Sequence, residues 1–231
     1  MYNLPQKLLA EFVGTFTLIF IGAGSICADA LLRAGAGPGV GILGIAVAHG
    51  LAIGIMVTAL GHISGGHFNP AVTIGFWVTK KLSTLHSISY WIAQLLGGIA
   101  GGYLLRAVMP SSVWPGPVWL GTPMLAPDYS RAHGMLLEGV MTFLLVFVIF
   151  ATAVDSHGAA SKVAGFAIGL TITMDILMGG PLTGAAMNPA RAVGPALASH
   201  QWANHGVYWV GPLLGGVIAG WLYNAMLLRE N

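Results

Sequence analysis

The chain of 231 residues is 56% hydrophobic and only 7% charged, with a formal net charge of +2 at pH 7. Soluble domains carry about 25% charged residues, so this sequence cannot cover a water-facing surface. The small charge and the lack of a basic run point to no nucleic-acid partner, and a single cysteine, Cys27, excludes a disulfide within the chain. We expect an all-α membrane protein.

Six apolar segments approach the length of about 20 residues that a helix needs to cross a bilayer. Two shorter apolar segments follow the second and the fifth of them, each after an Asn-Pro-Ala triplet. The sequence therefore predicts six transmembrane helices and two half-helices in a single channel domain, residues 1–231. The six spans lie at residues 8–31, 40–60, 86–109, 134–154, 163–181 and 206–228.

The two triplets are Asn69-Pro70-Ala71 and Asn188-Pro189-Ala190. Asn is a favoured N-cap and Pro at the first helical position loses no hydrogen bond, so each triplet predicts the start of a helix. The glycine-rich stretches before them, at 62–68 and 182–187, show no helical periodicity. Non-helical backbone at membrane depth survives only where it lines a cavity or is buried in protein. We expect these stretches to present backbone carbonyls to a pore.

A weak internal repeat relates the two halves of the chain. Residues 10–16 (AEFVGTF) resemble residues 137–143 (LEGVMTF), and each segment precedes one of the triplets. Each half reads helix, helix, half-helix, helix, and the odd number of full spans makes the halves antiparallel. We expect residues 1–110 and 131–231 to form an inverted repeat, with the positive ends of the half-helices meeting near the midplane.

The lysines predict the orientation in the membrane. If six spans alternate, all four lysines fall on the side of the two termini, and positively charged loops favour the cytoplasmic side. We therefore expect both termini in the cytoplasm, and a plasma (inner) membrane as the location. The lysines are Lys7, Lys80, Lys81 and Lys162.

With these features the sequence resembles the aquaporin (major intrinsic protein) family over essentially its full length. The resemblance rests on the two triplets, the six spans, the Ser64-Gly65-Gly66-His67 segment and Arg191 after the second triplet. It implies a right-handed bundle, assembled in membrane lipid as a homotetramer with one pore per subunit, that passes water and small neutral solutes. We expect no enzymatic activity, no cofactor and no metal site.

The resemblance also implies roles for single positions. Asn69 and Asn188 each point an amide N–H at the central solute, which orients the waters oppositely on the two sides and interrupts proton relay. Glu11 and Glu138, which are costly in a membrane, brace the backbone of the pore loops. The carbonyls offered to the solute are those of Gly65, Gly66, His67, Phe68, Gly184, Ala185, Ala186 and Met187.

The outer constriction, or selectivity filter, is implied to consist of His49, Ile176, Ala185 and Arg191. Strict water channels usually carry an aromatic residue on span two and a histidine on span five, whereas here a histidine lies on span two and an aliphatic residue on span five. This exchange resembles the vacuolar-membrane aquaporins of plants and their animal relative, which pass ammonia and hydrogen peroxide as well as water. A smaller ring and an apolar wall give a wider filter.

Several alternatives remain open. The related branch often has a further histidine in the loop after span three, but residues 121–124 read Gly-Thr-Pro-Met, which leaves a strict water channel without ammonia permeability as the alternative. Glycerol is disfavoured because Arg191 is followed by Ala192, where glycerol-conducting members have an aspartate. An ion-coupled secondary transporter would need an ionisable group facing the cavity, and the candidates are Glu11, Glu138 and Asp175. For Asp175 a bracing hydrogen bond is preferred over a role in handling ammonium.

Overall fold

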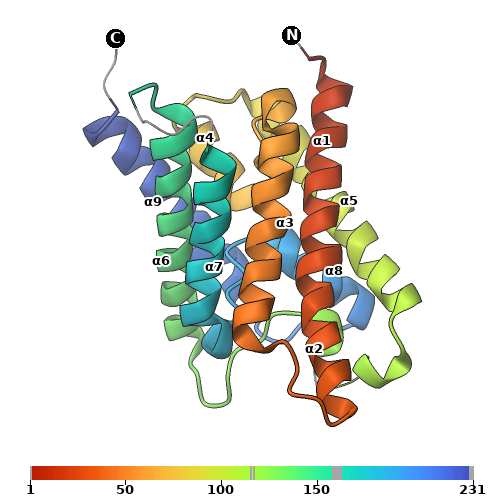
Figure 1. Cartoon of the computed structure of the whole chain (residues 1–231). Coiled ribbons are helices and arrows are strands. Elements are labelled where there is room, and N and C mark those ends of the chain that lie inside the picture. Colours follow the sequence, from red (N-terminus) through yellow and green to blue (C-terminus); the bar gives the residue numbers. More distant parts are fainter. Residues whose placement is uncertain (1, 115, 117, 158–162, 229–231) are drawn as a thin grey trace.

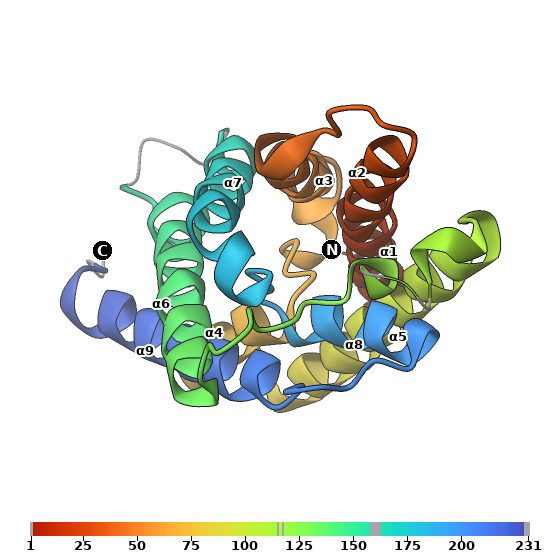
Figure 2. The ribbon, with the colours of Figure 1, turned by 90° about the horizontal axis from the view of Figure 1, so that it is seen from below.

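Long helices surround two short ones, α4 and α8, in the architecture that Figures 1 and 2 show from two directions. This computed structural model describes residues 2–114, 116, 118–157 and 163–228, so Lys162 lies outside the described residues. Within them every regular element is a helix, which confirms the predicted fold class. The elements are α1 (Leu4–Thr17), η1 (Leu18–Ala23), α2 (Gly24–Ala34), α3 (Gly41–Ser64), α4 (Pro70–Val78), α5 (Thr84–Val108), η2 (Ser111–Val113), η3 (Trp119–Gly121), α6 (Arg131–Ile149), η4 (Phe150–Val154), α7 (Ala164–Thr183), α8 (Pro189–Ser199) and α9 (Val207–Met226).

Five of the six predicted spans are long and apolar enough to cross a membrane, judged over the described residues. They are formed by α1 with η1 and α2, by α3, by α5, by α6 with η4, and by α7. The sixth, α9, equals α7 in length and, like α7, contains four glycines and a proline, but it is not among these five. It packs against α6 and α4 through those glycines and belongs to the same bundle.

Both half-helices begin at the triplets, as the capping residues predict. The side-chain oxygen of Asn69 accepts a hydrogen bond from the Ala71 N–H at 2.8 Å, and that of Asn188 accepts one from the Ala190 N–H at 2.9 Å. Figure 1 shows α4 and α8 in opposite halves of the bundle, whereas α1 begins and α9 ends at one common end. The division into repeats at 1–110 and 131–231 stays a prediction.

The non-helical stretches before the triplets are shorter than the glycine content predicts. α3 continues to Ser64 and α7 to Thr183, so that residues 62–64 and 182–183 are helical. Gly65 (φ 95°) and Gly184 (φ 83°) then adopt the left-handed conformation that ends a helix and that glycine adopts without strain. We call the remaining non-helical residues, 65–69 and 184–188, the two pore segments.

Glycine contacts set the distance between neighbouring long helices. On α9, a Cβ added to Gly215 would collide with the carbonyl group of Gly139 on α6. Between α3 and α7, a Cβ on Gly50 would meet the Gly169 carbonyl oxygen at 2.5 Å. Because membrane helices gain little from the hydrophobic effect between them, such close backbone packing is a main source of their association.

We predict that Gly215→Ala destabilises the bundle. The new methyl group must displace the α6 backbone, and over-packing of this kind costs about 1–3 kcal/mol. The melting temperature Tm of the purified protein in detergent should fall below that of the parent. Gly206→Ala is the control, because a Cβ there meets no atom within 4 Å. Equal Tm values for the two variants would contradict the close packing of α6 and α9.

Candidate functional site

The two pore segments meet through their asparagines. The Nδ2 of Asn69 donates to the Met187 carbonyl at 2.8 Å, and the Nδ2 of Asn188 donates to the Phe68 carbonyl at 2.9 Å. Each asparagine therefore caps its own half-helix with its oxygen and holds the opposite segment with its nitrogen. An amide nitrogen carries two hydrogens, so one hydrogen of each asparagine remains for the cavity that both residues line.

The residues whose carbonyls are expected to face the pore do not all line the same cavity. The central cavity, a space between the helices and the pore segments, is lined by Gly66, His67, Ala185, Ala186 and Met187. Gly184 instead lines a second, outer cavity. Gly65 and Phe68 line neither, and the Phe68 carbonyl already accepts from Asn188.

Glu11 holds the first pore segment with both carboxylate oxygens. Its Oε1 accepts hydrogen bonds from the Ser64 hydroxyl at 2.6 Å and the His67 N–H at 3.0 Å. Its Oε2 accepts from the Phe68 N–H at 2.6 Å and from the Gln94 amide at 2.8 Å. The carboxylate is fully buried, and these four donors replace the water that it loses.

Glu138 holds the second pore segment in the same manner. Its Oε1 accepts from the Thr183 hydroxyl at 2.7 Å and the Ala186 N–H at 2.9 Å, and its Oε2 accepts from the Met187 N–H at 2.7 Å. The partners occupy matching places in the two halves. The geometry is that of the braces the sequence predicts for Glu11 and Glu138.

Sequence reasoning missed a second pair of bracing residues at the ends of α3 and α7. Ser64 and Thr183 each donate to a glutamate, and their carbonyls accept from the Tyr90 hydroxyl at 2.7 Å and the Tyr208 hydroxyl at 2.9 Å. Both hydroxyl residues lie five positions before an asparagine of a triplet. This equal spacing in the two halves is a sequence signal by which the two bracing residues could have been found.

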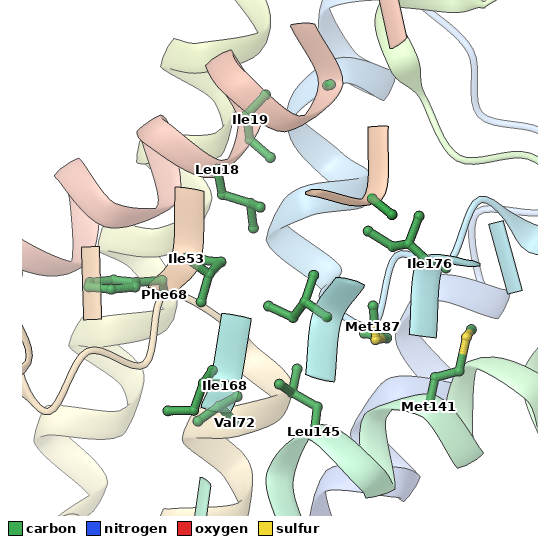
Figure 3. Close-up of a cluster of buried hydrophobic side chains, with 14 of the residues drawn as sticks. Leu18, Ile19, Ile53, Phe68, Val72, Met141, Leu145, Ile168, Ile176 and Met187 are labelled. Carbon is green, nitrogen blue, oxygen red and sulfur yellow. The ribbon is translucent and has the colours of Figure 1, made fainter. Parts of the chain in front are cut away.

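The inner part of the central cavity is narrow and apolar. Leu18, Ile53, Val72, Leu145 and Ile168 come from different helices and lie around it, as Figure 3 shows. The cavity leaves about 30 Å³ for the centres of water-sized molecules, whereas one water needs about 10–15 Å³. The volume is therefore enough for about two or three waters, and Asn69 and Asn188 are polar partners in its lining.

Three of the four predicted filter residues lie between the two cavities. His49, Ile176 and Arg191 line both the central and the outer cavity, whereas Ala185 lines the central one only. Because they are shared, these three side chains mark the boundary at which a solute passes from one cavity to the other. They come from α3, α7 and α8.

His49 has a defined tautomer. Its Nδ1 lies 2.8 Å from the Ile45 carbonyl oxygen, which can only accept, so Nδ1 carries the hydrogen and Nε2 is an acceptor. Nε2 lies 3.4 Å from Nη2 of Arg191, a long hydrogen bond. The neutral ring thus offers an acceptor at the boundary and faces a permanent cation.

Two N–H groups of Arg191 are held by hydrogen bonds, and a third has no partner. Its Nη1 donates to the Gly121 carbonyl at 2.8 Å, and its backbone N–H donates to Asn188 Oδ1 at 3.2 Å. Its Nε is buried and has no hydrogen-bond partner among the described residues. The guanidinium therefore keeps one N–H, on Nε, that binds no described residue.

Asp175 does not form the expected bracing bond with any described residue. Its Oδ2 is buried and accepts no hydrogen bond from the described residues. No group of three or more His, Cys, Asp or Glu side chains that could hold a metal ion occurs in the described part of the chain.

We predict that Glu138→Gln lowers stability and water flux together. Glutamine keeps the size but replaces one acceptor oxygen by a donor, so at least one N–H or hydroxyl partner loses its bond, at about 1–3 kcal/mol. Tm in detergent and osmotic shrinkage of proteoliposomes measure the two effects. Asp175→Asn is the matched control, since no described donor binds Asp175, and it should not lower Tm. A Glu138→Gln variant with parental Tm and flux would contradict the bracing role.

Comparison with known proteins agrees with this geometry. The family model described as "Major intrinsic protein" matches residues 2–223. A probable aquaporin TIP3-2 of Arabidopsis thaliana is 42% identical over 230 residues, covering 96% of this chain and 84% of the relative. A probable TIP-type aquaporin of Medicago truncatula is 44% identical over 225 residues, covering 96% and 87%.

A solved structure shows the same fold. The X-ray structure of the aquaglyceroporin from Plasmodium falciparum superposes with a TM-score of 0.83 and covers 97% of both chains, at 24% sequence identity. At that identity the match shows the fold of this chain but not which solute it passes. The family match and the TIP-type relatives show that this chain belongs to the major intrinsic protein family, the aquaporins, and is an integral membrane protein of a family of passive water channels rather than an enzyme.

Proposed function

We propose that this channel passes neutral ammonia and hydrogen peroxide as well as water, and excludes glycerol, protons and ions. The observation that carries the proposal is the pairing of His49 and Ile176 at the boundary between the two cavities. An imidazole there occupies less space than a larger aromatic side chain, and the isoleucine leaves one wall without hydrogen-bond partners. A solute that binds water less tightly than water binds itself loses less at such a wall.

Proton and ion exclusion is proposed to rest on three positive features. The N-termini of α4 and α8 point at the cavity centre with their positive ends. The free hydrogens of Asn69 and Asn188 face one water with two donors, so its lone pairs point inward and its hydrogens point away. Arg191 adds a permanent charge at the filter, and a cation that enters meets all three.

The second candidate function is a strict water channel. The observation in its favour is the outer cavity, where Thr122, Pro123 and Met124 form the wall and no histidine of that loop contributes. An ion-coupled transporter has less support, because the carboxylates of Glu11 and Glu138 are already bound by their bracing partners and Asp175 lines neither cavity.

We further propose a homotetramer in lipid, with both termini in the cytoplasm. Large apolar side chains exposed on the outer helix faces, such as Leu9, Leu136, Phe166 and Trp221, suit lipid or subunit contacts. The plasma-membrane location stays a prediction and has lost support, because the similar aquaporins are of the TIP type, the vacuolar-membrane branch. Cross-linking in native membranes and localisation in the source cell test these points.

The solute range is tested by exchanging the filter pair. Liposomes that contain the parent should shrink faster than empty liposomes under an osmotic gradient, and their lumen should alkalinise faster in an ammonium gradient. His49→Phe with Ile176→His rebuilds a narrower, water-selective ring, so the double variant should keep most water flux and lose most of the ammonia-driven alkalinisation. If parent and variant both alkalinise at the rate of bare lipid, the strict water channel is correct.

Proton exclusion is tested with Arg191→Val. The variant removes the fixed charge and the bond to the Gly121 carbonyl but keeps the capping of α8 by the Asn188 side chain. Water flux should stay within a few-fold of the parent, while a pH dye should report a proton leak under an imposed pH gradient. A variant as proton-tight as the parent would assign the exclusion to the half-helix ends and asparagines alone.

A further inference from the structure

The first span contains a π-helical turn, η1, beside the filter. Leu18–Ala23 widens the helix between α1 and α2, and such turns often occur at functional sites. Its backbone is held in place by Ser25, whose hydroxyl donates to the Gly22 carbonyl at 2.6 Å. None of the expectations from the sequence assigns a role to this turn, although Leu18 at its start lines the central cavity.

Gly22 lies directly behind the imidazole of His49. A Cβ added to Gly22 would lie 2.5 Å from Cδ2, 2.7 Å from Nε2 and 2.9 Å from Cγ of that ring. Carbon atoms in contact prefer about 3.5–4.0 Å, so a methyl group and the ring cannot both occupy their places. The His49 ring therefore occupies space that a side chain at position 22 would need.

The same turn supports Arg191 through one intermediate. Gly121 (φ 71°) packs on Ala23 so closely that an added Cβ would lie 2.7 Å from the Ala23 carbonyl oxygen. The Gly121 carbonyl accepts the hydrogen bond from Arg191 Nη1. Of two neighbouring residues of η1, Gly22 therefore meets the His49 ring itself and Ala23 meets Gly121, which binds Arg191. The two polar side chains lie 3.4 Å apart at Nε2 and Nη2.

We propose that η1 sets the aperture of the filter, with Gly22 as a positioning residue that determines how far the His49 ring stands back from the lumen. The proposal deepens the proposed function and rests on it, since it concerns which small neutral solutes fit. The bond from Nδ1 to the Ile45 carbonyl fixes the other edge of the ring. A group added at position 22 therefore moves the ring toward Arg191 and the space between the cavities.

The test is Gly22→Ala in proteoliposomes, together with His49→Ala and the double variant. Gly22→Ala should lose most of the ammonia-driven alkalinisation and slow osmotic shrinkage, because the displaced ring narrows the filter. His49→Ala removes the ring, so the double variant should conduct like His49→Ala alone. Such non-additivity is expected only if the two residues act through one contact.

Gly24→Ala is the matched control in the same span. A Cβ there would meet only Cδ2 of Leu105 at 3.2 Å, the movable end of a side chain. This variant should conduct as the parent does. Flux of Gly22→Ala that equals or exceeds the parent value overturns the proposal, as does a double variant that stays as slow as Gly22→Ala.

Folding gives a second and independent readout. If Gly22→Ala has a lower Tm or does not fold, His49→Ala in the same chain should restore Tm, because the collision involves that ring. Failure of the double variant to fold contradicts the contact. If the parent itself does not speed water flux, the proposed function fails, and the Gly22–His49 contact is still decided by the Tm values.

Discussion

The pore depends on two buried carboxylates that hold non-helical backbone inside the membrane. Non-helical backbone at membrane depth leaves N–H groups without helical partners, and lipid cannot bind them. Glu11 and Glu138 meet this demand from neighbouring helices, each with two acceptor oxygens for two backbone N–H groups and a hydroxyl. A buried carboxylate without partners would be costly, and so would these buried N–H and hydroxyl groups without an acceptor. The hydrogen bonds between them remove both costs.

The position of the asparagines follows from these braces. Once each pore segment is held by its own glutamate, the tips of α4 and α8 approach closely enough for Asn69 and Asn188 to bind the opposite segment. The exchange of bonds fixes the two positive helix ends face to face, a repulsive arrangement that the reciprocal hydrogen bonds offset. The pore segments can lie this close only if the long helices around them also pack closely, and the glycine contacts between those helices allow this.

Most of the fold could be read from the sequence because its signals are local. Long apolar runs, an N-cap asparagine and a proline at the first helical position each act within a few residues, and the half-helices begin where they predict. The ends of α3 and α7 could not be placed as well. Glycine is compatible with both helix and loop, and the sequence does not tell which glycine turns left-handed. In the structure these are Gly65 and Gly184, each next to a residue whose hydroxyl binds a glutamate.

The filter shows why the rest of the site escaped sequence reasoning. The family resemblance identified His49 and Ile176, because members of one family keep the spacing between such positions and the triplets. The surface behind those side chains comes from η1 and from the loop at Gly121, which follow no offset and no periodicity. The width of a ring built from several segments depends on how near each backbone approaches, and that is a property of packing. Two chains with the same four filter residues can therefore differ in the solutes they admit when the residue behind one ring changes from glycine to alanine.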